Sequence, residues 1–181
     1  TSSVLSMQSM FRLATAFNQP LNFNTSSVTN MSYMFASATS FNSALTFSDT
    51  SSVGNMSNMF NNATAFNQPL NWNTSSVTNM NGMFRLASSF NSALTFSDTS
   101  SVITMQQMFY QATAFDEPLT FDTSSVTNMG EMFQNAIAFN QLLNWDVSSL
   151  TNMSRMFGGA TSFNQPLNWD VSSVTTMFQT F

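Results

Sequence analysis

One phrase returns through this sequence every 24 or 25 residues. Its clearest marker is a column of phenylalanines at equivalent positions: Phe11, Phe35, Phe60, Phe84, Phe109, Phe133, Phe157 and Phe181. Repeats of this length are typical of stacked-coil proteins, in which each unit buries its apolar side chains against its neighbours. The repeat therefore restricts the fold more than any other feature of the chain.

The apolar residues keep to this register along the whole sequence. The 15 methionines fall in two columns, and a leucine column is followed two places later by Phe or Trp. A longer unit is also present, because residues 12–60 and 61–109 match closely. We expect these columns to form one shared core, since no single coil can cover its own apolar residues.

Within a coil, Val28, Met31, Met34, Phe35 and Ala38 are spaced by three, three, one and three residues. This spacing predicts one face of a short helix or 3₁₀ segment. The serines just before Val28 stand where an N-cap is expected.

Farther along the coil, Leu45 and Phe47 alternate with polar residues, which predicts a very short strand. A proline precedes this strand in four coils, where a missing N–H is tolerated: Pro20, Pro69, Pro118 and Pro166. The predicted fold is therefore α/β, a right-handed, leucine-rich-repeat-like solenoid of about 24–25 residues per coil. Each coil is expected to hold one short strand and one short helix or 3₁₀ segment. Residues 1–181 are expected to form a single, uncapped solenoid of about seven coils, as a fragment of a longer array.

Composition excludes several classes of function. Only 6% of residues are charged, the net charge is -5, and His and Cys are absent. Nucleic-acid binding needs clustered cations, and a structural zinc site needs His or Cys ligands. No apolar stretch is long enough to span a bilayer. We expect no cofactor, no catalytic residue and no enzymatic activity, and the uncharged polar surface favours an extracellular or cell-surface location.

Two strings carry a family resemblance: SSVTNMSYMFASATSFN, which starts at Ser26, and NQPLNWD, which starts at Asn164. The pattern V-T-N-M-x-x-M-F with F-N-Q-P-L-N-W-D resembles the repeat of BspA-like surface proteins of bacteria, mycoplasmas and protists. That family is a leucine-rich-repeat variant long described as a domain of unknown function. The resemblance implies a surface-exposed or secreted solenoid, with adhesion or host interaction in some members and no catalytic residues.

A column of Asn and Asp follows the predicted strands: Asn24, Asp49, Asn73, Asp98, Asp122, Asp146 and Asp170. Asp122, Asp146 and Asp170 come from successive coils and would form a carboxylate ladder, which a cation such as Ca²⁺ could neutralise. The alternative is structural, with each side chain accepting hydrogen bonds from the N–H groups of the following turn. Because Asn occupies the same column, we favour the structural interpretation.

Thr25, Ser26 and Ser27 have equivalents in each coil and suggest a regular hydroxyl array, from which a minor ice-binding alternative follows. These residues also begin the predicted helices, which weakens that alternative. Six N-x-[ST] sequons are glycosylation candidates: Asn24, Asn30, Asn55, Asn62, Asn73 and Asn152. Hydrogen bonding of these Asn side chains in turns or ladders is the competing interpretation.

Apolar residues at the two ends of the predicted solenoid indicate how copies of the chain could associate. An uncapped solenoid would expose apolar residues that other coils could cover, at eight positions: Val4, Met7, Met10, Phe11, Val174, Met177, Phe178 and Phe181. Head-to-tail stacking of copies would give an open filament. The expected partners are further coils of the same chain, other copies end to end, or a surface protein or glycan.

The sequence thus favours a non-enzymatic structural repeat of the cell surface, in adhesion or as a filament or appendage unit. The alternative is a binding module that recognises a protein or glycan on the concave strand face. Uniform positions beside the strands, such as Asn22 and Asn71, favour the structural role, because a specific binder would vary its surface from coil to coil.

Overall fold

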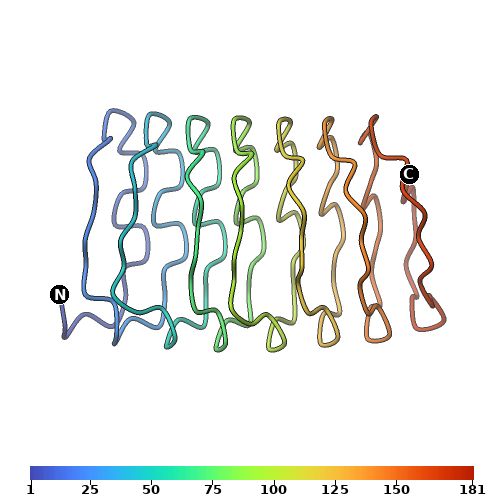
Figure 1. Cartoon of the computed structure of the whole chain (residues 1–181), viewed down its shortest axis with the longest axis horizontal. Coiled ribbons are helices and arrows are strands. Elements are labelled where there is room, and N and C mark those ends of the chain that lie inside the picture. The colour runs from blue at the N-terminus through green and yellow to red at the C-terminus, as the bar shows by residue number, and fades with distance from the viewer.

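The computed structural model describes residues 1–181. The chain winds through successive coils that stack side by side along one axis (Figure 1). We number the coils by their residues: 1–24, 25–49, 50–73, 74–98, 99–122, 123–146 and 147–170 are coils 1 to 7, and 171–181 begin coil 8. Each coil has a tight-turn side, residues 30–38 in coil 2, and an extended side, residues 43–47 in coil 2.

The local structure differs from the one that the sequence predicts. No residue lies in a helix, and strand pairing is limited to isolated parallel bridges. The predicted α/β leucine-rich-repeat-like solenoid, with one strand and one helix or 3₁₀ segment per coil, is therefore wrong. The structure replaces it with a stack of coils built from tight turns and irregular extended segments.

Successive tight turns occupy the segment where a helix was predicted. In coil 2 the Met34 N–H donates to the Met31 carbonyl (3.2 Å), and the Ala38 N–H donates to the Phe35 carbonyl (3.0 Å). Tyr33 and Ser37, each the third residue of its turn, have φ of 58°. A positive φ at this position is the requirement of a type II turn, and it interrupts a right-handed helix. Turns of this kind share the three-residue spacing of a helix, which is why the apolar pattern misled.

Other N–H groups on the tight-turn side bond to the next coil. The N–H groups of Met31, Tyr33 and Phe35 donate to carbonyls of coil 3, at 2.9, 3.0 and 2.8 Å. Parallel bridges accordingly join every coil to the next through one column: Ser6, Asn30, Asn55, Asn79, Thr104, Asn128, Asn152 and Thr176. The continuous β-type pairing thus lies on the side where the sequence predicted helices.

The extended side, where strands were predicted, pairs only in some coils. Its bridges join Leu21 to Leu45 and Leu70 to Leu94. In both bridged pairs the second coil carries Ala before its leucine, whereas the second coil of every unbridged pair carries Pro or Leu there. The 49-residue double repeat of the sequence therefore corresponds to a pair of coils bonded along both sides.

The repeated apolar columns form one hydrophobic core of 44 buried residues, as the sequence predicts. Phe84 is fully buried, and its ring stacks on Phe60 in the preceding coil (5.5 Å between centroids) and on Phe109 in the next (5.6 Å). Within its own coil it stacks on Phe90 (4.1 Å). Most of the methionines are also buried, so the two Met columns are core residues and not a binding surface.

We predict that Phe84→Ala lowers the free energy of unfolding by about 3–5 kcal/mol, because it removes a buried ring that stacks on three other rings. Chemical denaturation followed by circular dichroism measures this change. Ser89→Ala is the control, since Ser89 is exposed in the same coil, and it should change stability by less than about 0.5 kcal/mol. Equal effects of the two substitutions would contradict the aromatic core.

A matched pair of glycines tests the left-handed turn positions. Gly82 has φ of 59°, and an added Cβ would lie 2.6 Å from Asn58 Oδ1, whereas at Gly54 the nearest atoms lie at 3.8 Å. We predict that Gly82→Ala destabilises the chain by about 1–2 kcal/mol. Gly54→Ala should be neutral or stabilising by up to about 1 kcal/mol. Thermal unfolding of both variants distinguishes them, and the reverse order would refute the turn assignment.

Candidate functional site

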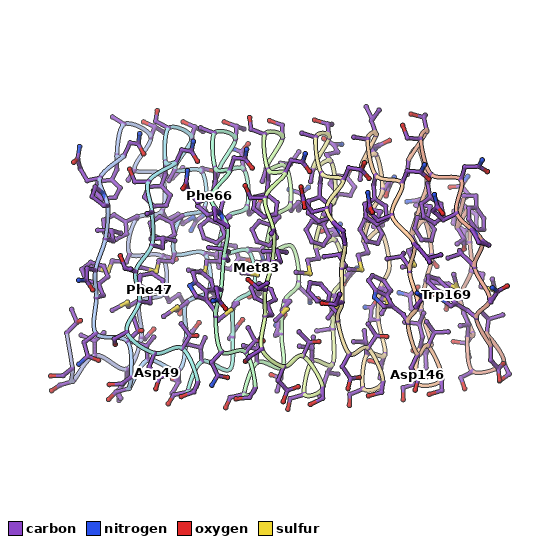
Figure 2. The ribbon with its side chains drawn as sticks, in the orientation of Figure 1. Phe47, Asp49, Phe66, Met83, Asp146 and Trp169 are labelled. Atoms are coloured by element: carbon purple, nitrogen blue, oxygen red, sulfur yellow. The ribbon has the colours of Figure 1, made fainter.

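The Asn and Asp column closes the turn at one end of each coil. The Ser26 N–H donates to Asn24 Oδ1 (3.1 Å), and the Ser148 N–H donates to Asp146 Oδ1 (2.9 Å). The same bond recurs at every member of the column, from Asn24 to Asp170. Asp49 and Asp146 both lie along this edge of the stack (Figure 2). The structure thus gives these side chains the turn-forming role that the sequence favours.

These turns lower the pKa of four of the carboxyl groups. For Asp49, Asp98 and Asp170, the backbone N–H of the serine two residues on is the main cause, followed by its hydroxyl. For Asp146 the Ser148 hydroxyl lowers the pKa most, followed by the Ser148 N–H. Each interaction favours the ionised carboxylate over the protonated acid.

The carboxylates of the predicted ladder are not arranged as a cation-binding site. Asp122, Asp146 and Asp170 each accept a hydrogen bond from the serine of their own turn. No group of three or more acidic side chains is gathered in a metal-binding arrangement. The calcium hypothesis gains no support from this geometry and stays a prediction.

The Ser and Thr hydroxyls are engaged within the stack. Thr50 is buried and donates to the Asn73 carbonyl at the other end of its own coil (2.8 Å), and Thr25 donates in the same way to the Asp49 carbonyl. Ser26 Oγ donates to Asn24 Oδ1 (2.8 Å), and Ser27 Oγ donates to the Ser2 carbonyl (3.0 Å). The regular hydroxyl array of the ice-binding alternative therefore has its donors bound internally.

The six sequon asparagines lie in two environments. Asn24 and Asn73 are exposed in the end turns, and the other four, Asn30, Asn55, Asn62 and Asn152, are partly buried on the tight-turn side. The Ser32 N–H donates to Asn30 Oδ1 (2.9 Å), and Asn62 Nδ2 donates to Ser37 Oγ (3.2 Å). Glycosylation of these residues stays a prediction, and Asn24 and Asn73 are the accessible candidates.

A second Asx column holds neighbouring coils together, and sequence reasoning missed it. The Asn91 N–H donates to Asn67 Oδ1 (2.8 Å), and the Asn140 N–H donates to Asp116 Oδ1 (2.8 Å). The available signal is the amide or carboxylate that follows the second phenylalanine of every coil: Asn18, Asn42, Asn67, Asn91, Asp116, Asn140 and Asn164. These side chains accept from the backbone N–H one coil on, whereas the Asn24 column accepts from the backbone N–H two residues on, in its own turn.

All three cations of the chain lie over aromatic rings of the next coil. Arg85 lies over Tyr110 (5.0 Å to the ring centroid), Arg155 over Phe178 (5.2 Å) and Arg12 over Tyr33 (5.8 Å). Cation–π contacts of this kind are electrostatic attractions between the charge and the ring face. The arginines are therefore separated along the stack and do not form a basic patch.

One cavity of about 350 Å³ opens on the extended side, between coils 5 and 6. Pro118 and Phe121 belong to its first wall, and Leu142 and Trp145 belong to its second. The sequence offered one sign of it, because Leu142 replaces the Pro or Ala of every other coil. We call this cavity the 118–145 groove.

The eight residues of the terminal layers are not equally exposed. Four are exposed (Met10, Met177, Phe178 and Phe181), three are half-buried (Val4, Phe11 and Val174), and Met7 is buried. The expectation that Met7 is uncovered is therefore wrong. Because the chain forms no helix, it has none that could span a membrane.

Comparison with protein families supports the repeat organisation. Residues 1–95, 44–120 and 117–181 match the family described as Mycoplasma protein of unknown function, DUF285. The chain belongs to this family. No curated protein and no solved structure matches it. Membership establishes a tandem repeat of unknown function, consistent with the resemblance to surface repeats of mycoplasmas.

The lowered pKa values predict acid-dependent stability. A carboxyl group with a lowered pKa in the folded chain stabilises it above the unfolded pKa of about 3.9 and loses this effect as the pH falls through the folded value. We therefore predict that the thermal midpoint falls below about pH 4. The variant Asp98→Asn/Asp146→Asn/Asp170→Asn keeps an acceptor oxygen, as Asn24 and Asn73 do, and should show a shallower fall. An unchanged pH profile would contradict the assignment.

Proposed function

We propose that this chain is a non-enzymatic structural repeat of a cell-surface or extracellular protein, acting in adhesion or as a filament or appendage unit. The carrying observation is the continuous bonding of each coil to the next, by bridges from Ser6 to Thr176 and by aromatic stacks through the core. Such a construction makes an elongated body that lengthens by about 4.7–4.9 Å with every added coil. A spacer or stalk on a cell surface needs a body whose length is set by the number of repeats.

The distribution of chemical groups supports a structural role. Carboxylates along the end turns accept hydrogen bonds from the serines of their own turns, and the arginines lie singly over aromatic rings. The Asp116 carboxylate likewise accepts hydrogen bonds from the Asn140 N–H and from Gln141 Nε2 (3.0 Å). Catalysis requires titratable groups that converge on one reacting atom, and this arrangement disperses them.

Membership of a mycoplasma repeat family, together with the resemblance to BspA-like repeats, supports the surface location. We predict that antibodies against the purified chain label the outside of intact cells that produce it, as seen by immunogold electron microscopy. A cytosolic protein of the same cells serves as the control and should be labelled only after permeabilisation. Labelling of the chain that also requires permeabilisation would overturn the proposal.

Electron microscopy of the native material separates the two structural roles. Continuous fibres of coil-stack width would support the filament unit. Dispersed single particles would instead support adhesion by individual molecules.

A binding module for a protein or glycan is the second candidate function. One observation favours it, the 118–145 groove, which interrupts an otherwise uniform extended side. No comparable observation favours ice binding, since the hydroxyl donors are engaged within the stack.

A further inference from the structure

The side chains that differ most from coil to coil lie on the outer face of the tight-turn side, residues 30–38 in coil 2 and their equivalents. In coils 1 to 7 the residue two places before the repeated phenylalanine is Ser, Tyr, Asn, Gly, Gln, Glu and Arg in turn. The residue just after that phenylalanine is Arg, Ala, Asn, Arg, Tyr, Gln and Gly. On the extended side, the column that begins at Asn22 holds only Asn and Thr. A specific binder varies its surface from coil to coil, so this contrast favours recognition by the tight-turn side.

The same face carries every arginine and every tyrosine of the chain: Arg12, Arg85, Arg155, Tyr33 and Tyr110. Glu131 is its one carboxylate, and the other seven of the chain's eight lie outside the tight-turn side. This face is therefore positive although the net charge of the chain is -5, and an acidic partner is complementary to it. Arg and Tyr are also the residues that are enriched at the energetically dominant positions of protein interfaces.

Aromatic rings hold two of the arginines in place without using their N–H groups. The Arg85 guanidinium lies over the Tyr110 ring (5.0 Å to the centroid), and Arg12 is held in the same way. Neither side chain donates a hydrogen bond within the chain, whereas Arg155 Nε donates to Gln179 Oε1 (3.1 Å). Arg12 is exposed and Arg85 is partly exposed. Each guanidinium therefore keeps its N–H groups for a carboxylate, which it binds through two parallel hydrogen bonds.

The spacing of these two arginines indicates the form of the partner. Arg12 and Arg85 occupy one column in coils 1 and 4, so three coils at 4.7–4.9 Å each place them about 14–15 Å apart. Four residues of an extended strand span about 13–14 Å and return the side chain to the same face. A strand that lies along the stack therefore presents side chains i and i+4 to the two arginines. Asn61 lies between them in the same column, and its Nδ2 donates to Asn58 Oδ1 (3.0 Å), which leaves Asn61 Oδ1 for an N–H of such a strand.

We propose that the outer face of the tight-turn side binds an extended acidic segment of a partner protein, whose carboxylates at positions i and i+4 pair with Arg12 and Arg85. Tyr33 and Tyr110 hold the two guanidinium groups in position, and the Asn61 amide pairs with the backbone of the segment. Nucleic acid fits this face poorly, because isolated cations do not neutralise a row of phosphates. The inference rests on the second candidate function, a binding module, and assigns it a face separate from the 118–145 groove.

The test uses the full chain and an array of peptides in which two glutamates are separated by one to eight positions within a neutral polar sequence. At low ionic strength, where exposed charges are least screened, binding should be strongest at a separation of four. Fluorescence anisotropy with that peptide then compares variants. We expect Arg12→Gln and Arg85→Gln each to weaken binding about tenfold, since each removes a charge-assisted pair. Arg155→Gln removes the same charge outside this column and should change the affinity less than about twofold.

Binding of no peptide, or binding that is independent of the glutamate separation, would overturn the proposal, as would equal effects of Arg155→Gln and Arg85→Gln. Preference for heparin, a sulfated glycan, over every peptide would also overturn it. Circular dichroism and thermal unfolding identify any variant that loses affinity through misfolding, in which case the other member of the Arg12 and Arg85 pair provides the result. The surface labelling described above uses no ligand, so failure of peptide binding and failure of the structural role are distinguished.

Discussion

Stacking of identical rings between neighbouring coils is the interaction on which the rest of this structure depends. Phe109 lies 5.6 Å from both Phe84 and Phe133, and it also stacks on Phe115 of its own coil (4.0 Å). Each ring therefore completes its burial only when the coils on both sides are present. Stability is consequently shared between neighbours, and the sequence must repeat because every layer receives and presents the same surface.

The core could stack in register only because the backbone turns sharply between its apolar residues. Positive φ at two positions in each coil, Gln107 and Gln111 in coil 5, places Met108 and Phe109 on the inside between two turns. Most of these positions are not glycine, although left-handed conformations disfavour other residues by about 1–2 kcal/mol. The N–H groups freed from helical bonding donate to the next coil, and burial of the aromatic columns offsets the unfavourable φ. Backbone and core thus specify the same spacing between coils.

The sequence was sufficient to predict the buried core residues and one row of Asx turns. It was not sufficient to predict the local backbone conformation of each coil. Phe84, Met83 and their equivalents in coils 2 to 6 are fully buried, as their strict register indicated, and the Asp146 column forms the expected Asx turns. The helix prediction failed because successive tight turns repeat apolar residues at the same three-residue spacing. Tyr33 and Gln111 have positive φ but are not Gly, Asn or Asp, so their residue types do not predict the turns. The groove was not predicted because the residues of the extended side are nearly uniform across the coils. Its only sign in the sequence is Leu142, which replaces Pro or Ala in a single coil.

The residue before the leucine column decides how the extended side behaves. Where it is Ala93, the backbone approaches its neighbour and the Thr95 N–H reaches the Leu70 carbonyl. Where Pro118 is followed by Leu142 in the next coil, the backbones of the two coils do not pair along this side, and a cavity opens. The core does not change between the two cases, because the tight-turn side keeps its bridges throughout. One side of the coil therefore maintains the stack, and this division leaves the other side free to vary without loss of the fold.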